Sequence, residues 1–315
     1  MRAIRLALCL LIFIWMPLAN ADDAPKSKQT PEISLVTFNL YHDKADWPKR
    51  LPLILAELRR LNPDVITLQE VIGHENLRNQ AQTLADALGY EYAFSSVDPE
   101  NKPQRYGNAI LTRRPIVARH WTRLQPFDDS RTALHLRMAI GDRVLNVYTT
   151  HLHWTDGGGA IRQRQVADLM RFIADTSDGA PSLVAGDFNA VATAPELGAL
   201  TANFQDAYGK LHPDEAADPK ANSTLNLSYY PPKRIDHAFL QKDALAPEAA
   251  TIVLNRADDE GTWPSDHYGM YVRFKVLPSR TASALPSASA DDSRRSIGIE
   301  LGNRDSHGGS ARRPD

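Results

Sequence analysis

The sequence predicts an α/β domain built from two packed β-sheets with helices on their outer faces. Two observations lead to this prediction. Short apolar segments with the pattern of strands recur along most of the chain. Only a few segments show helical spacing, and they are interspersed among the strands. Because a strand with an apolar face needs a second layer to cover it, this pattern favours two sheets packed together with helices outside.

The individual elements follow from local patterns, taken in chain order. Residues 33–40 alternate apolar and polar side chains, as a strand does. Residues 47–61 place apolar side chains at helical spacing, and Asn62-Pro63 ends that helix. A second helix covers residues 77–88, where Gly89 is placed to cap it. The remaining predicted elements are strands at 65–68, 107–112, 131–139, 143–151, 182–185, 234–240 and 267–276 and a helix at 161–173.

Both ends of the chain lie outside this domain, which we assign to residues 32–277. Residues 1–21 resemble a signal peptide, with a basic start, a short apolar stretch and a small-residue cleavage signal. The apolar stretch is shorter than the ~20 residues of a membrane span, although an uncleaved anchor is the alternative. Residues 22–31 form a linker, and residues 278–315 form a low-complexity tail expected to be disordered. We therefore expect a secreted or periplasmic protein without a transmembrane segment.

Composition excludes some kinds of site. Cys9 is the only cysteine and lies in the predicted signal peptide, so the processed chain has no thiol for catalysis, zinc or a disulfide. The formal net charge of −2 lacks the basic excess typical of tight, non-specific nucleic-acid binding. A carboxylate metal site would itself add acidity, so this charge does not exclude a nucleic-acid substrate. Nothing implies a stable protein partner, and a monomer is expected.

Metal-capable and catalytic side chains recur at the ends of the predicted strands. An acidic residue in such a place is often only a turn residue or a helix cap. A whole series of them, each following or interrupting a buried strand, is hard to explain as separate caps. The series consists of Asn39, Glu70, His151, Asp187, Asn189, Asp236, Asp266 and His267.

These residue types suit the hydrolysis of a phosphate ester. Attack of water on phosphorus needs an activated nucleophile and neutralised phosphoryl oxygens. Hard oxygen ligands such as Glu70 and Asp266 suit Mg²⁺ or Mn²⁺. A histidine held by a carboxylate suits general-base work near neutral pH. Asn189 can donate a hydrogen bond to a phosphoryl oxygen without adding charge.

Seven short strings along the chain carry a family resemblance. They are Thr37-Phe38-Asn39-Leu40, Leu68-Gln69-Glu70-Val71, Tyr106-Gly107-Asn108-Ala109-Ile110-Leu111, Thr150-His151-Leu152, Gly186-Asp187-Phe188-Asn189, Arg234-Ile235-Asp236-His237 and Ser265-Asp266-His267. In this order they resemble the motifs of the endonuclease/exonuclease/phosphatase superfamily, and the chain looks like a secreted bacterial-type member. The resemblance covers residues 33–276 and implies the DNase I-like fold, a four-layer α/β/β/α sandwich whose two sheets are mainly antiparallel.

The resemblance also implies a metal site for Mg²⁺ or Mn²⁺. Glu70 looks like the principal metal ligand, with Asn39 beside it. Asp266 resembles a second acid that binds or orients the metal, and Asp187 would position the attacking water or a second metal.

The matched strings imply catalytic roles as well. His267 looks like the general base, and Asp236 resembles the acid that orients its imidazole. Asp187 joins them through the attacking water, and Asn189 would hold a phosphoryl oxygen. His151 resembles the histidine that stabilises the phosphate or assists the leaving group.

Five further residues are weaker candidates for substrate binding. Arg131 offers a fork that suits phosphate, although a surface ion pair is the alternative. Trp154 and Tyr230 lie on loops expected to rim the same mouth, where they would stack on a base, face a quaternary ammonium group, touch a membrane interface or simply cap the core. Asn108 and Arg234 lie within the matched strings.

These features rank the possible functions. Abasic-site endonucleases carry an Asp where this chain has Tyr41, and export also argues against DNA repair. Our first hypothesis is an extracellular nuclease in which a histidine activates the water that attacks a metal-bound phosphate. A sphingomyelinase-like phospholipase and a small-molecule phosphatase are the alternatives. A catalytically inactive binding module is more distant, because every metal and base residue is present.

Overall fold

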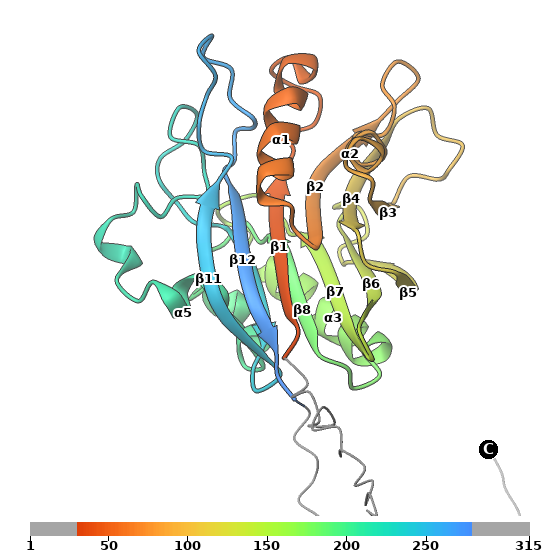
Figure 1. Cartoon of the computed structure of the whole chain (residues 1–315), viewed down its shortest axis with the longest axis vertical. Coiled ribbons are helices and arrows are strands. Elements are labelled where there is room, and N and C mark those ends of the chain that lie inside the picture. Colours follow the sequence, from red (N-terminus) through yellow and green to blue (C-terminus); the bar gives the residue numbers. More distant parts are fainter. Residues whose placement is uncertain (1–29, 279–315) are drawn as a thin grey trace, which may run out of the picture. The chain divides into compact units, whose positions relative to one another are not determined.

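The computed structural model describes residues 30–278, whose arrangement is shown in Figure 1. The predicted signal peptide, residues 22–29 of the predicted linker and residues 279–315 of the predicted tail lie outside the described residues. Within residues 30–278, no helix is both long enough and apolar enough to span a bilayer.

The strands form two six-stranded sheets. They are β1 (Glu32–Asn39), β2 (Val65–Gly73), β3 (Glu91–Ser96), β4 (Arg105–Thr112), β5 (Ile116–Arg123), β6 (Thr132–Ile140), β7 (Arg143–His151), β8 (Ser182–Asp187), β9 (Phe204–Asp206), β10 (Asp236–Gln241), β11 (Leu245–Val253) and β12 (Gly269–Val276). The first sheet has the order β11-β12-β1-β2-β4-β3, and the second has the order β5-β6-β7-β8-β10-β9. The pairs β1–β2 and β7–β8 are parallel, whereas the other neighbouring strands pair antiparallel.

Helices cover the outer face of each sheet, which confirms the predicted four-layer sandwich. They are α1 (Trp47–Leu61), α2 (Gln80–Leu88), α3 (Gly159–Thr176), α4 (Gly198–Thr201) and α5 (Ala207–Leu211), with 3₁₀ turns η1 (Pro195–Leu197) and η2 (Glu215–Ala217). Helices α1 and α2 pack on the first sheet, and α3 and α4 pack on the second. Gly89 caps α2 in a left-handed conformation, as the sequence predicts.

Three apolar clusters separate the layers. In β1, Leu35 faces the second sheet while the next residue, Val36, faces the helices. The same alternation in β8 directs Leu183 toward the first sheet and Val184 toward α3. Because both faces of these central strands are buried, each strand contributes to two layers. Burial of each large apolar side chain stabilises the fold by about 1.5–3 kcal/mol.

Four strands were not expected from the sequence. β5 is an edge strand whose residues are mostly exposed, so it has little apolar pattern to recognise. β11, also at an edge, contains Pro247 and an irregularity between Pro247 and Ala249. Proline and bulges are typical of edge strands, where a missing backbone donor costs little. β3 is a third edge strand, and β9 has three residues.

A fully buried arginine on α1 holds two loops together. The Arg50 guanidinium donates to the carbonyl oxygens of Leu40 at 2.7 Å and of Pro264 at 2.8 Å. It also donates to the carbonyl oxygens of His42 and Lys44, both at 2.8 Å. Burial lowers the pKa of Arg50 to about 10. This one side chain therefore fixes the loop after β1 against the loop that precedes Asp266.

A buried carboxylate performs a similar task at the opposite end of β1. Asp64 accepts hydrogen bonds from the backbone N–H and the hydroxyl of Ser34, both at 2.9 Å. Its other oxygen accepts from Arg113 at 2.9 Å and lies 2.7 Å from Arg114. Burial alone would raise the pKa of Asp64, but the hydrogen bonds from Ser34 and Arg113 outweigh it and lower the pKa. Asp64 thus joins β1 to the end of β4 in its charged form.

Asp64→Asn should destabilise the protein at pH 7 by about 1.5–3 kcal/mol, the usual worth of hydrogen bonds to a charged group. A depressed folded-state pKa stabilises the protein above the unfolded pKa and loses this effect as pH falls through the folded pKa. The difference from wild type, measured by urea unfolding, should therefore shrink below about pH 4. The exposed Asp86→Asn serves as the control and should change stability little. A difference that stays constant down to pH 2 would contradict this account.

Candidate active site

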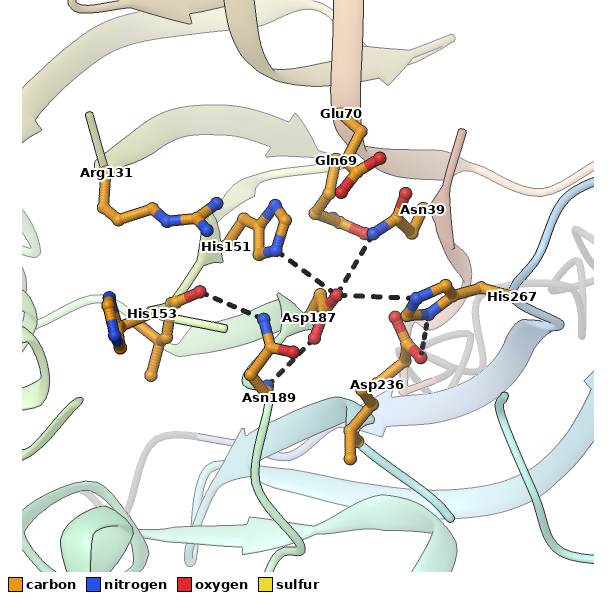
Figure 2. Close-up of polar contacts among 12 residues, drawn as sticks. Asn39, Gln69, Glu70, Arg131, His151, His153, Asp187, Asn189, Asp236 and His267 are labelled. Atoms are coloured by element: carbon orange, nitrogen blue, oxygen red, sulfur yellow. Dashed lines mark hydrogen bonds and ion pairs between the residues drawn. The ribbon is translucent and has the colours of Figure 1, made fainter. Parts of the chain in front are cut away.

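Polar residues from both sheets meet at one end of the sandwich (Figure 2). Asn39, His151 and Asp187 are the last residues of β1, β7 and β8. Asp236 is the first residue of β10, which runs antiparallel to β8 and pairs Asp236 with Asp187. His267 lies two residues before β12, which runs antiparallel to β1. The strand directions therefore place all five residues at the same end of the two sheets.

Asp187 lies at the centre of this cluster. Its Oδ2 accepts a hydrogen bond from Asn39 Nδ2 at 3.1 Å and lies 3.4 Å from His151 Nε2. Its Oδ1 accepts from the backbone N–H of Asn189 at 2.9 Å. Burial and the charge of Asp236 raise the pKa of Asp187 to about 7, although His267 opposes the shift. Because Asn39 belongs to the first sheet, this hydrogen bond also links the two sheets at the site.

Two glycines allow strands to approach closely beside these residues. A β-carbon on Gly186, directly before Asp187, would lie 2.0 Å from the carbonyl oxygen of Thr150. A β-carbon on Gly107 would lie 1.8 Å from the carbonyl oxygen of Ser95. The close packing of β7 against β8 pairs His151 with Asp187 and so depends on Gly186.

His267 and Asp236 form a buried pair. Asp236 Oδ2 lies 2.9 Å from His267 Nδ1, which leaves His267 Nε2 facing Asp187 Oδ2 at 3.9 Å. Burial opposes a charged imidazole, but the charges of Asp236 and Asp187 raise the pKa of His267 to about 10. The arrangement orients Nε2 toward the centre of the site.

Glu70 reaches the site because β2 is irregular there. The register of β2 with β4 shifts between Leu68 and Val71, and Glu70 adopts a left-handed φ of 54°. Such a conformation costs a non-glycine residue about 1–3 kcal/mol. Burial would raise the pKa of Glu70, but the hydrogen bond with His42 outweighs it and lowers the pKa to about 2. The bulge therefore directs a carboxylate with a lowered pKa beside Asn39 (Figure 2).

Asp266 is held at the edge of the same group. Its Oδ2 accepts from the Tyr230 hydroxyl at 3.1 Å, and its Oδ1 accepts from the Ser265 hydroxyl at 3.2 Å. Burial and the charge of Glu70 raise the pKa of Asp266. Ser265 also donates to the carbonyl oxygen of Asn39 at 2.8 Å, so both loops are in contact.

His151 lies in a second, more cationic part of the site. Its Nδ1 lies 3.2 Å from the Tyr106 hydroxyl, which in turn lies 3.5 Å from Arg131 Nη1. Burial and the charge of Arg131 lower the pKa of His151 well below its usual value, so its imidazole is neutral. Arg131 is 8% exposed, and its buried Nε lies 3.9 Å from Asp129 Oδ2, an ion pair beyond hydrogen-bond distance. Its guanidinium points toward His151 (Figure 2).

The donor set fits a hard divalent cation. Glu70 is ionised, and Asn39 and Asp266 add oxygen atoms of the kind that Mg²⁺ and Mn²⁺ prefer. Within residues 30–278, the close group of three metal-capable side chains is a different one, formed by Asp187, Asp236 and His267 with ligand atoms within 4.8 Å of one another. Asp236 Oδ1 is also buried without a hydrogen-bond partner in the described part of the chain. Of the predicted metal ligands, only Asp187 belongs to this group.

The weaker candidates have different surroundings. Arg234 is ion-paired with Asp206 at 2.7 Å and Glu215 at 2.6 Å, so its guanidinium is engaged in the fold and we do not retain it for substrate binding. Asn108 is likewise committed, since its amide donates to Thr132 at 3.1 Å.

The remaining candidates keep free surface. Trp154 is 68% exposed and Tyr230 is 42% exposed. Asn189 donates from Nδ2 to the carbonyl oxygen of Leu152 at 3.0 Å and has a left-handed φ of 50°. That conformation turns the Asn189 side chain toward the space between Asp187 and His151 (Figure 2).

Sequence reasoning missed three neighbours of the site. Gln69 donates to Thr149 at 3.0 Å and so joins the two sheets, while its Oε1 is buried without a partner in residues 30–278. Tyr106 contacts His151, and His42 Nε2 lies 2.9 Å from Glu70 Oε2. Gln69 and Tyr106 stand inside the matched strings, so the resemblance offered a signal for them, whereas His42 carried none.

Comparisons with known proteins agree with this fold. The model of the Endonuclease/Exonuclease/phosphatase family matches residues 36–267. Rat tyrosyl-DNA phosphodiesterase 2 is 27% identical over 258 residues, covering 78% of this chain and 67% of that protein. YbhP of Escherichia coli K12 is 30% identical over 184 residues, covering 52% of this chain and 70% of YbhP. The human nocturnin catalytic domain with bound sulfate superposes with a TM-score of 0.65 at 25% identity, covering 78% of this chain and 94% of that domain.

Gly186→Ala should force β7 and β8 apart, because the new methyl group would overlap the Thr150 carbonyl oxygen. We expect a loss of about 1–3 kcal/mol in the free energy of unfolding, measured with urea. Gly198→Ala is the matched control, since nothing lies within 4 Å of its β-carbon and the residue is in a helix. The control should be as stable as wild type or slightly more so. Equal stability of Gly186→Ala and wild type would refute the close approach.

Proposed function

The chain belongs to the endonuclease/exonuclease/phosphatase family and is a hydrolase of phosphate esters, and we propose that it is a secreted nuclease that uses Mg²⁺ or Mn²⁺. Secretion is supported by the signal-peptide pattern of residues 1–21. The choice of Mg²⁺ or Mn²⁺ is supported by the oxygen-rich donor set around Glu70.

One observation carries the proposal. His267 Nε2 faces the centre of the site while Asp236 holds Nδ1 at 2.9 Å, and Glu70 presents an ionised carboxylate in the same pocket. A fixed imidazole and a cation site on either side of one space are what water attack on a phosphate ester requires.

Each residue of the site has a separate role in the attack of water on the phosphate ester. His267 Nε2 accepts a proton from the attacking water, and Asp236 stabilises the imidazolium that results. Asp187 orients the same water, since it lies between Asn39 and His267. A divalent cation at Glu70 would neutralise phosphoryl oxygens. Positive charge there also opposes the imidazolium and so favours the form of His267 that accepts a proton.

The opposite side of the site suits the leaving group and the phosphate. His151 is neutral and buried, so it can donate a hydrogen bond to an oxygen that gains negative charge. Arg131 Nε lies 3.9 Å from Asp129 Oδ2, and the other guanidinium N–H groups of Arg131 are of the kind that bind phosphoryl oxygens. Asn189 Nδ2 donates one N–H to the Leu152 carbonyl oxygen, and its second N–H would be an uncharged donor for a phosphoryl oxygen.

Nucleic acid is the substrate that the surroundings favour. Rat tyrosyl-DNA phosphodiesterase 2, whose name states a phosphodiester of DNA as its target, is 27% identical to this chain over 258 residues. The exposed rings of Trp154 and Tyr230 provide surfaces on which bases can stack. A phospholipid headgroup or a small soluble phosphate would use the same pocket, so both are arms of the test.

The full chain should be assayed with and without EDTA on DNA, RNA, tyrosyl-DNA, sphingomyelin, bis(p-nitrophenyl) phosphate and p-nitrophenyl phosphate. We expect cation-dependent cleavage of nucleic acid. His267→Ala should lower kcat by about 10²–10⁴, because it removes the general base. Glu70→Gln should raise the cation concentration needed for activity. The control His120→Gln, exposed on β5, should leave activity unchanged.

Each result of this assay decides something. Preference for sphingomyelin or for the monoester would replace the nuclease proposal with one of its alternatives. Phosphate binding without turnover would indicate the binding module. Full activity of both His267→Ala and Glu70→Gln would show that the reaction occurs elsewhere.

Arg131→Gln should lower kcat/KM on the diester by about 10–100-fold, the equivalent of a charged hydrogen bond worth ~1.5–3 kcal/mol. Arg123→Gln is the matched control, because Arg123 is exposed on the adjacent strand and donates to the carbonyl oxygen of Phe127. Steady-state kinetics with a thermal melt of each variant separates a lost phosphate contact from a folding defect. Unchanged kinetics for Arg131→Gln would remove it from the site.

A further inference from the structure

A histidine outside the matched motifs lies against the proposed metal ligand. His42 follows β1 by three residues, and its Nε2 lies 2.9 Å from Glu70 Oε2. His42 also lines a cavity of about 430 Å³ together with Asp43 and His74. Glu70 is not among the residues that line this cavity, but its side chain remains 19% exposed.

The His42 ring is fixed in place. It stacks on the Tyr106 ring with centroids 4.9 Å apart and planes 18° apart. Its backbone carbonyl oxygen accepts from Arg50 at 2.8 Å and from Gln80 at 2.6 Å. Two buried side chains therefore hold the backbone while Tyr106 holds the ring.

Both partners of the contact have strained backbones. His42 has a φ of 50° and Glu70 has a φ of 54°, both in the left-handed region. Non-glycine residues keep such conformations, at a cost of about 1–3 kcal/mol each, where the surrounding structure enforces them, and such residues cluster at functional sites. Here the strain brings one imidazole nitrogen to one carboxylate oxygen.

The separation of these two atoms suits a shared cation. The two atoms lie 2.9 Å apart, close enough for both to bind one cation or to share a hydrogen bond. An imidazole nitrogen is a better ligand for first-row transition metals, Mn²⁺ included, than for Mg²⁺, which prefers oxygen.

We propose that His42 supplies Nε2 as a nitrogen ligand to the cation held by Glu70, and that the site therefore prefers Mn²⁺ to Mg²⁺. The inference rests on the proposed metal dependence and deepens it. Its competitor is a purely structural hydrogen bond between His42 and Glu70. The two differ in whether the nitrogen is bonded to the metal.

Electron spin-echo spectroscopy of the Mn²⁺-loaded full chain tests this directly, because a ligating ¹⁴N couples to the electron spin. The variant is His42→Asn, since asparagine tolerates a left-handed φ and has no imidazole. His74→Asn is the matched control, as His74 lies in the same cavity but pairs with Asp43. Calorimetry gives the Mn²⁺ and Mg²⁺ affinities of each protein.

Wild type and His74→Asn should show an imidazole ¹⁴N coupling that His42→Asn lacks or shows weakened. The ratio of Mn²⁺ to Mg²⁺ affinity should fall about tenfold or more in His42→Asn. If that variant does not fold, ¹⁵N-histidine labelling of wild type keeps the test, because a nitrogen ligand changes the spectrum.

The outcomes separate the two proposals. An unchanged spectrum and affinity ratio in His42→Asn, with Mn²⁺ still bound, would overturn the role of His42 alone. A labelled wild type whose spectrum does not change on ¹⁵N substitution would do the same. Absence of Mn²⁺ and Mg²⁺ binding to wild type would overturn the metal dependence and the role of His42 together.

Discussion

A buried carboxylate that needs donors from several elements is the constraint on which this site depends. Asp187 is 1% exposed, and an isolated carboxylate at such a depth would be strongly destabilising. Asn39 from the first sheet and the backbone of Asn189 from the second supply its hydrogen bonds. The two sheets must therefore pack in one relative position for this charge to be accommodated, and that same position brings His267 to its Nε2 contact.

The features that could be predicted from the sequence are those that depend on local pattern. Strand periodicity and strand direction locate Asn39, His151 and Asp187, because the ends of parallel strands share an edge. The direction of the Glu70 side chain depends on a bulge in β2, which the alternation of apolar and polar residues along a strand does not predict. The engagement of Arg234 with Asp206 and Glu215 depends on contacts 28 and 19 residues away. Exposed edge strands such as β5 lack the apolar face that makes a strand recognisable.

Arg50 connects helix α1 to the loops that carry residues of the site. Its guanidinium has carbonyl oxygens as partners in the loops that flank Asn39 and Ser265. The loop after β1 contains residues with left-handed backbones, among them Tyr41 and His42. The hydrogen bonds from Arg50 offset the strain of that loop. The buried Arg50 side chain on α1 therefore fixes the position of the loop that lies beside the site.

The missing side chain at Gly186 has a consequence for redesign of the pocket. If the exposed ring of Trp154 contacts substrate as proposed, its replacement would alter substrate preference without disturbing a packed interior. Gly186 offers no such freedom, since the backbone of Thr150 occupies the volume that any β-carbon would need. A library of variants selected for new substrates should keep Gly186 constant and vary the exposed residues around the proposed site. The fold thus allows side chains to change at the exposed rim of the proposed site, whereas the strand packing beneath it at Gly186 does not tolerate a β-carbon.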